Sequence, residues 1–194
     1  MNKASENYGF FCNQIENINY FYPVDVLWRR QKCHALGLKL KRPLDYRANK
    51  KILGTPSKYK FIGGTGNCFY RALSYVVTGT EHNQFLLRTK ISQVVRTNDK
   101  ILHFLDGEEE LTKYLKLINI NEEDTWSTSV DVLAAAILLN TSIYIYNSIK
   151  ERWYFFSKDY PAAYSSVSTE NERFIYLLNL SLTHFHIVED IRFL

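Results

Sequence analysis

Hydrophobic residues recur at helical spacing through the first two thirds of the chain and then gather in short runs toward its end. Apolar positions three and four residues apart predict helices over 24–36, 69–77, 81–97, 101–104, 109–117 and 130–139. The last of these reads VDVLAAAILL and is apolar nearly all round, so we expect it to be buried. Short runs rich in β-branched and aromatic residues predict strands over 142–147, 151–156, 174–180 and 184–188. Helices followed by short strands indicate an α+β fold with a small, mostly antiparallel sheet packed on helices.

The segments between these elements are polar or irregular. Residues 38–57 form a basic stretch interrupted by Pro43, Gly54 and Pro56, and we expect an irregular loop there. Residues 59–62 are predicted to be a short extended approach to a glycine-rich turn. Polar loops are expected over 121–129, which contains Trp126, and over 160–172.

The chain has 194 residues, enough for one domain with a hydrophobic core and short for two. Its net charge is +4, and much of the excess lies between residues 29 and 60. That segment contains Arg29, Arg30, Lys32, Lys39, Lys41, Arg42, Arg47, Lys50, Lys51, Lys58 and Lys60, opposed by Asp45. A charge run of this kind is usually a solvated face, which is the favoured interpretation. Nucleic-acid contact is the minority alternative, because zinc-finger spacing and an RNP-type aromatic strand are both absent from the sequence.

Three cysteines, Cys12, Cys33 and Cys68, match neither a zinc site nor a redox pair, so we expect no metal cofactor. An odd cysteine count without a disulfide framework favours a reducing compartment. The first residues lack a basic segment followed by a long apolar run, and the longest apolar run is too short to span a bilayer. The expectation is therefore a cytoplasmic, monomeric protein without a membrane partner.

The sequence GGTGNC, residues 63–68, carries the clearest chemistry. A reactive cysteine acts as a thiolate, and the positive end of a helix lowers the thiol pKa. Cys68 lies where the glycine turn meets a predicted helix, so the sequence predicts a lowered pKa for its thiol. Backbone N–H groups of the turn, at Gly66 and Asn67, could hold the oxyanion that forms when a thiolate attacks a carbonyl. The alternative is a buried structural cysteine, and this interpretation is kept for Cys12 and Cys33.

A nucleophilic cysteine needs a base, most often a histidine. His34 and His82 lie among polar residues at helix ends and are expected on the surface, and His103 has no evident polar partner in the sequence. His184 and His186 lie two apart on a predicted strand, so their side chains share one face. His184 is the preferred base, with His186 as the group that orients it. His186 as the base is the alternative, and Val188 two residues on could not orient it.

Three segments together resemble the ovarian-tumour (OTU) cysteine proteases. GTGNCFYRALS is similar to that family's nucleophile motif, usually Gly-Asp-Gly-Asn-Cys-(Phe/Leu)-(Phe/Tyr)-Arg-Ala. TWSTSVDVLAAAILLNTSIYIYN resembles its second block, a Trp-containing loop, an acidic residue that opens an Ala-rich helix, and a strand. THFHIV resembles its terminal His-(Tyr/Phe/Trp)-(Asp/Asn) block. The segments come in family order and cover roughly residues 59–190.

The resemblance implies a papain-like OTU fold, a small sheet packed between helices, and a thiol protease that removes ubiquitin from conjugates. It implies that Cys68 is the nucleophile and His184 the general base, and that Trp126 and Phe185 lie near the ubiquitin tail. The partners it implies are ubiquitin or polyubiquitin and ubiquitinated proteins. The division expected is an N-terminal helical and basic extension over 1–58 and a catalytic domain over 59–194.

Two positions depart from the family pattern. Thr65 stands where the family has Asp, and His186 stands where it has Asp or Asn as third catalytic member. Neither residue supplies negative charge, so the predicted site is weaker or more pH-sensitive than one with a carboxylate. The alternatives to a deubiquitinase are therefore a catalytically weak ubiquitin-binding module and a hydrolase of another ubiquitin-like modifier.

Overall fold

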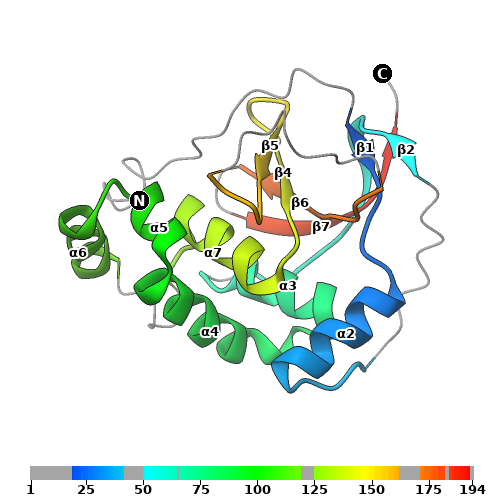
Figure 1. Ribbon diagram of the computed structural model, residues 1–194. Coiled ribbons are helices and arrows are strands. Elements are labelled where there is room, and N and C mark those ends of the chain that lie inside the picture. Colours follow the sequence, from blue (N-terminus) through cyan, green and yellow to red (C-terminus); the bar gives the residue numbers. More distant parts are fainter. Residues whose placement is uncertain are drawn as a thin grey trace.

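The computed structural model describes residues 19–41, 50–64, 66–118, 125–161, 171–181 and 184–192. The predicted site residue Thr65 lies outside the described residues. The helices are α2 (Val26–Leu36), α3 (Cys68–Thr78), α4 (Gln84–Thr97), α5 (Asp99–Phe104), α6 (Glu108–Leu117) and α7 (Ser129–Leu139), with a 3-10 turn η1 (Glu81–Asn83) before α4 (Figure 1). The strands are β1 (Tyr20–Phe21), β2 (Lys51–Ile52), β3 (Thr55–Lys60), β4 (Ile143–Asn147), β5 (Arg152–Phe156), β6 (Ile175–Leu180) and β7 (His184–Arg192).

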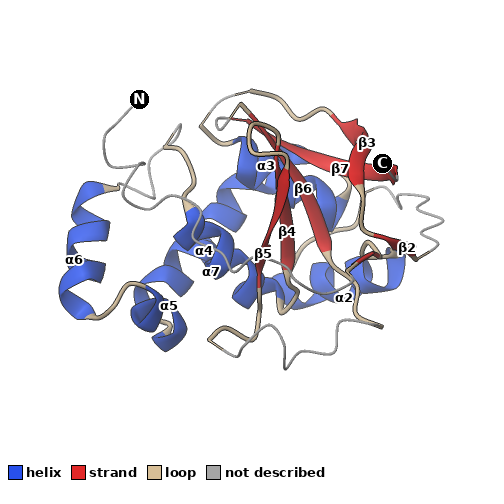
Figure 2. Ribbon diagram, turned by 90° about the horizontal axis from the view of Figure 1, so that it is seen from above, coloured by secondary structure: helices blue, strands red, loops and turns tan. Residues whose placement is uncertain are grey.

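Five strands form one sheet in the order β3-β7-β6-β4-β5, and β1 pairs with β2 in a separate ribbon. Three of the four pairings in the large sheet are antiparallel, and β4 with β6 is parallel. Seen from above, α5 and α6 lie at the end of the molecule away from β3 and β7 (Figure 2). The predicted α+β class with a mostly antiparallel sheet is therefore confirmed.

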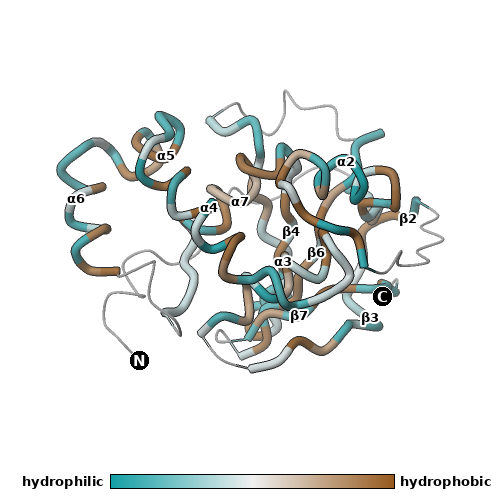
Figure 3. Tube along the Cα trace, turned by 90° about the horizontal axis from the view of Figure 1, so that it is seen from below, coloured by the Kyte–Doolittle hydropathy of each residue, from teal (hydrophilic) through white to brown (hydrophobic). Residues whose placement is uncertain are grey.

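Apolar side chains cover both faces of the sheet. On one face, alternate residues of β7, Phe185 and Ile187, join the main core with α3, α4 and α7. On the other face, an aromatic cluster contains Phe21, Tyr144, Phe155, Phe174 and Tyr176. Figure 3 shows mostly hydrophilic positions along α6, with a few hydrophobic ones between them. The central strands are buried from both sides, which explains their continuous apolar runs.

The N-terminal segment 19–41 packs closely on the rest of the fold. Asp25 caps α2 by accepting a hydrogen bond from the Trp28 N–H at 2.9 Å, and Gly37 ends the helix with φ +69°. The Trp28 indole N–H donates to the Thr141 hydroxyl at 2.8 Å, which ties α2 to the end of α7. The extension predicted over 1–58 therefore contributes, in its described part, buried residues such as Val24 and Cys33.

The irregular loop expected over 38–57 is wrong in its second half, because β2 and the first half of β3 lie there. The boundary predicted between residues 58 and 59 falls inside β3, which pairs with β7 from Thr55 to Lys60. This edge strand is mostly polar and exposed, and it contains Pro56, so the sequence lacks the alternation that identifies a half-buried strand. Pairing with β7 decides its conformation. The division into two domains itself stays a prediction.

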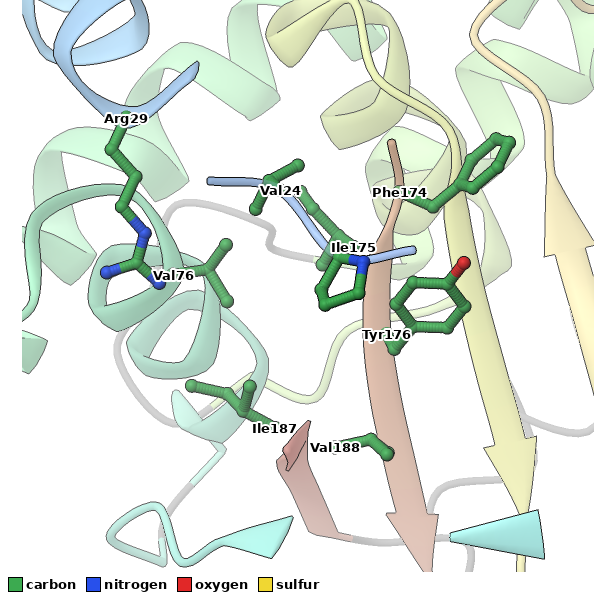
Figure 4. A pocket seen from close by; sticks show the side chains of 9 residues that line it. Val24, Arg29, Val76, Phe174, Ile175, Tyr176, Ile187 and Val188 are labelled. Atoms are coloured by element: carbon green, nitrogen blue, oxygen red, sulfur yellow. The ribbon is translucent and has the colours of Figure 1, made fainter. Parts of the chain in front are cut away.

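A small apolar pocket lies between the start of α2, α3 and strands β6 and β7 (Figure 4). Val24, Val76, Ile175 and Ile187 are among its lining residues, and the Arg29 side chain reaches toward Val76. Arg29 is 1% exposed, so this member of the basic run is not part of a solvated face. Cys68, His184 and His186 are not among the lining residues. Among the described residues, no helix is long and apolar enough to cross a membrane.

Candidate active site

Cys68 is the first residue of α3 and follows directly on the glycine turn. The helix buries Phe69, Leu73, Val76 and Val77 against the core, the face that the sequence predicts. Asn67 precedes the helix, and its carbonyl accepts the Arg71 N–H at 2.9 Å, which starts the helical hydrogen-bond ladder. The backbone N–H groups of Cys68 and Phe69 thus belong to the first turn, where they have no partner within the helix.

The Cys68 residue is 1% exposed. Burial raises the pKa of its thiol, and this effect outweighs hydrogen bonding by the backbone of Phe185, Phe69 and Cys68 and the nearby charge of Arg71, all of which lower the pKa. The lowered pKa expected from the helix terminus is therefore wrong in direction. The helix end does favour the thiolate, but removal from water costs more.

His184 opens β7, and its imidazole is held by the segment that leads from β3 into the glycine turn. Its Nε2 lies 3.3 Å from the Ile62 carbonyl oxygen. Its Cε1 would lie 2.6 Å from a Cβ atom added to Gly64. The ring therefore rests on the backbone of the turn, in a space that only glycine at position 64 leaves open.

His186 is buried, at 1% exposed, on the same face of β7 as His184. Its Nδ1 accepts the Ile62 N–H at 3.2 Å, and its ring centroid lies 5.0 Å from that of His184. The Tyr59 ring stacks on the His186 ring with centroids 5.2 Å apart, and the Phe61 ring lies tilted against it at 4.9 Å. Burial, and secondarily the charge of His184, lower the pKa of His186. His186 is therefore a neutral hydrogen-bond acceptor near neutral pH.

The two residues predicted to contact a bound tail differ in exposure. Trp126 is 46% exposed and lies in the loop before α7. Phe185 is 3% exposed and packs edge to face on Phe69, with ring centroids 5.3 Å apart. The Phe185 ring is a core residue, so contact with a bound tail does not fit its burial. Its backbone rather than its ring faces Cys68.

The sequence analysis missed Arg88, which joins the two loops of the site. This residue of α4 is 3% exposed. One terminal nitrogen donates to the Asn67 side-chain oxygen at 2.7 Å and to the Thr125 carbonyl at 2.8 Å, and it lies 3.4 Å from the Gly66 carbonyl. Its guanidinium also lies over the Tyr70 ring at 4.0 Å. The sequence did contain one indication of this role. Arg88 lies on the same face of the helix as the apolar residues Leu87, Ile91 and Val95, where a charged side chain is unexpected.

A buried carboxylate completes this polar network. Asp131 is fully buried and forms a capping box at the start of α7, accepting the Thr128 N–H at 2.7 Å. The Tyr114 hydroxyl lies 2.8 Å from the Thr128 hydroxyl and 3.3 Å from Asp131. Burial and the Asp131 charge raise the pKa of Tyr70 and of Tyr114 well above the usual range. These contacts fix the start of α7 and the Trp126 loop that precedes it.

The remaining histidines lie on the surface. His34, His82 and His103 are exposed, and His103 Nδ1 lies 3.2 Å from the Tyr160 hydroxyl, a partner the sequence does not suggest. Cys33 is buried and its thiol donates to the Val77 carbonyl at 3.4 Å, a structural role. Within the part of the chain that the structure describes, no group of three or more His, Cys, Asp or Glu side chains is arranged to hold a metal ion.

Comparisons with known proteins place this chain and its fold in one family. The family profile described as "OTU-like cysteine protease" matches residues 63–186. A curated relative, "OVARIAN TUMOR DOMAIN-containing deubiquitinating enzyme 7" of Arabidopsis thaliana, is 25% identical over 111 residues, which cover 56% of this chain and 28% of the relative. The matched region thus spans little more than a quarter of that protein's length.

Solved structures agree on the fold. The viral OTU domain protease from Dera Ghazi Khan virus superposes with a TM-score of 0.50 at 15% identity, covering 67% of this chain and 78% of that one. The OTUD1 OTU domain gives a TM-score of 0.50 at 18% identity, with 66% and 83% covered. The profile match spans well over half of the chain, and the chain belongs to the OTU-like cysteine protease family.

Proposed function

We propose that this chain is a thiol-dependent deubiquitinase that hydrolyses the peptide or isopeptide bond after the C-terminal glycine of ubiquitin. The observation that carries the proposal is the close approach of the start of β7 to the N-terminus of α3, two segments far apart in the sequence. The start of β7 lies against the N-terminus of α3, so that Cys68 interacts with the backbone of Phe185, the residue directly after His184. A nucleophile and a base 116 positions apart in sequence thereby come from adjoining element ends.

In the proposed reaction, His184 takes the Cys68 proton as the sulfur attacks the glycine carbonyl. Backbone N–H groups of the turn and first helical residue hold the oxyanion. The imidazolium then protonates the departing amine, and the C–N bond breaks to leave a thioester. A water molecule, deprotonated by His184, hydrolyses this thioester and regenerates the thiol. The raised pKa of Cys68 means that its thiol is protonated in the resting site, so the proton moves when substrate is bound rather than before.

Support for the substrate class comes from the named activity of the Arabidopsis relative and from the Trp126 loop. That relative is named a deubiquitinating enzyme. Trp126 is exposed and its loop is joined to the nucleophile turn through Arg88 and Thr125. In the proposed complex, the Trp126 side chain flanks a narrow channel for the extended ubiquitin tail. Such a channel would admit the two glycines that end this tail and exclude larger side chains. Trp126→Ala should therefore raise KM for ubiquitin conjugates more than it lowers kcat.

The test is reaction of the purified chain with ubiquitin that carries a thiol-reactive C-terminal group, read as a mass increase. A probe built on a second modifier and a Cys68→Ala control are run in parallel. An adduct that depends on both ubiquitin and Cys68 is the expected result. An adduct with the second modifier alone would change the substrate class and keep the mechanism.

Burial of Cys68, its raised pKa and the absence of a carboxylate at position 186 favour one second candidate, a ubiquitin-binding module with little turnover. Folded protein that binds ubiquitin but forms no adduct with either probe would establish that candidate in place of the enzyme. A cytoplasmic location remains part of the proposal on the strength of cysteine usage. The monomeric state stays an expectation.

A further inference from the structure

The backbone N–H and carbonyl of Ile62 each contact one of the two histidines of β7. The N–H donates to His186 Nδ1 at 3.2 Å, and the carbonyl oxygen lies 3.3 Å from His184 Nε2. Ile62 is 0% exposed and follows β3 at the entrance to the glycine turn. The hydrogen bond to His186 is therefore shielded from competing water, which strengthens it, whereas the contact with His184 is partly buried.

We propose that the Ile62 carbonyl, positioned by the hydrogen bond from the Ile62 N–H to His186, is the group that orients the His184 imidazole, and that His186 is a positioning residue acting through the backbone of Ile62. His184 then carries its proton on Nε2 and donates it to Ile62, which leaves Nδ1 to exchange a proton with Cys68. The catalytic part of this assignment rests on the proposed function, whereas the tautomer of His184 can be measured without any turnover.

The hydrogen-bond roles follow from what each group can donate. A carbonyl oxygen only accepts, so the His184 nitrogen that faces it must bear the proton. A backbone N–H only donates, so His186 Nδ1 must be unprotonated, and neutral His186 carries its proton on Nε2. Nδ1 is the only ring nitrogen of neutral His186 that can accept a hydrogen bond, and it already accepts one from the Ile62 N–H. Direct orientation of His184 by His186 is replaced by contact of both rings with the backbone of the same residue, Ile62.

The surroundings of His186 restrict the movement of its ring. Tyr59 of β3 stacks on the ring, and Phe61, which follows β3, packs against it at a tilt. The backbone of His186 belongs to β7, which lies between β3 and β6 in the sheet. Ring rotation would have to disrupt this stacking as well as the bond to Ile62. A shift of the Ile62 backbone, by contrast, would move the carbonyl acceptor away from His184, and misplacement by about 1 Å can cost roughly 100-fold in rate.

The first experiment reads the histidine tautomers by ¹⁵N NMR in a Cys68→Ala variant, in which no thiol proton can complicate the result. Above the pH at which the rings protonate, both His184 and His186 should be the Nε2–H tautomer. In the same background, His186→Phe should leave His184 without a single preferred tautomer. His184 found with its proton on Nδ1 would overturn the assignment, as would a His184 tautomer that does not respond to His186→Phe.

The second experiment separates the acceptor from the ring. His186→Phe keeps the aromatic stack and removes the acceptor, whereas His186→Asn places its side-chain oxygen where Nδ1 was and removes the ring. On a ubiquitin substrate, Phe should lower kcat by about 100-fold with KM little changed, and Asn should recover most of that loss. Equal loss in both variants would assign the effect to ring packing and contradict the inference. Wild-type protein without turnover would refute the proposed function, and the NMR result would still decide the inference.

Discussion

The His184 imidazole lies directly on the backbone of Gly64. A Cβ atom added at Gly64 would come within 2.6 Å of His184 Cε1 and 3.2 Å of Nε2, whereas His184 Nε2 now lies 3.3 Å from the Ile62 oxygen. The absence of one methyl group thus permits the ring position on which the hydrogen bond to Ile62 depends.

Gly64→Ala should therefore displace His184 and lower the rate of the Cys68 reaction with the ubiquitin probe by at least about 10-fold. The backbone of His184 is held in β7 by pairing with Leu180 of β6, so it cannot easily move away from the added methyl group. Gly63→Ala is the matched control, since its Cβ would meet the Arg71 guanidinium at 3.0 Å, the far end of a flexible side chain. Both rates are read by mass spectrometry over time, and equal rates for the two variants would contradict this interpretation of Gly64.

Arg88→Met should disturb both loops of the site and destabilise the fold. It would remove the buried donor shared by Asn67 and Thr125 and leave the fully buried Asp131 without that nearby positive charge. Losing such a buried charge costs about 3 kcal/mol. Urea denaturation measures the free energy of unfolding, and Arg96→Met, at an exposed position of the same helix, is the control. A loss no larger than that of the control would show that the network does not depend on Arg88.

The raised pKa of Cys68 predicts its pH dependence. A thiol whose pKa is raised in the folded state stays protonated at pH values where an unfolded cysteine would ionise. Its contribution to stability is complete below the ordinary value of 9.0 and is lost as pH rises above it. Alkylation of Cys68 by iodoacetamide should accordingly keep accelerating with pH beyond 9.0.

Arg71 provides the matched variant for this measurement, because its charge lowers the pKa of Cys68. Arg71→Gln should move the alkylation profile to still higher pH. Peptide mapping distinguishes Cys68 from Cys33 and Cys12. An activated thiolate would give an alkylation rate that reaches its plateau by about pH 7, and that result would exclude a protonated Cys68 thiol in the resting protein.

The indole of Trp28 should anchor the N-terminal segment to the rest of the fold. Trp28→Phe removes the hydrogen bond to Thr141 and should cost about 1 kcal/mol, whereas Trp28→Ala also removes packing and should cost more. Leu27→Ala, whose side chain is 61% exposed, should change the free energy of unfolding little. Thermal and urea unfolding measure all three. A single transition for each is expected, and a separate early transition in Trp28→Ala would favour an independent N-terminal unit.

Much of this fold could be predicted from periodicity. The helices from α2 to α7 and the strands β4 to β6 have apolar patterns that local sequence shows, and their observed bounds differ by a few residues at most. β3 could not be found in this way. Its residues are polar, and they form a strand because β7, more than 120 positions later, offers an unpaired edge.

The site divides in the same manner. The glycine turn, Cys68 at a helix start and a histidine pair on a strand are local patterns, so the sequence alone identified them and, through their order, the family. Other features of the site depend on contacts between segments far apart in the chain. These are the burial of Cys68, the core position of Phe185, the hydrogen bonds by which Arg88 joins two loops, and the contacts of His184 and His186 with Ile62. Desolvation and hydrogen-bond geometry are properties of the packed molecule, and only the tertiary structure decided them.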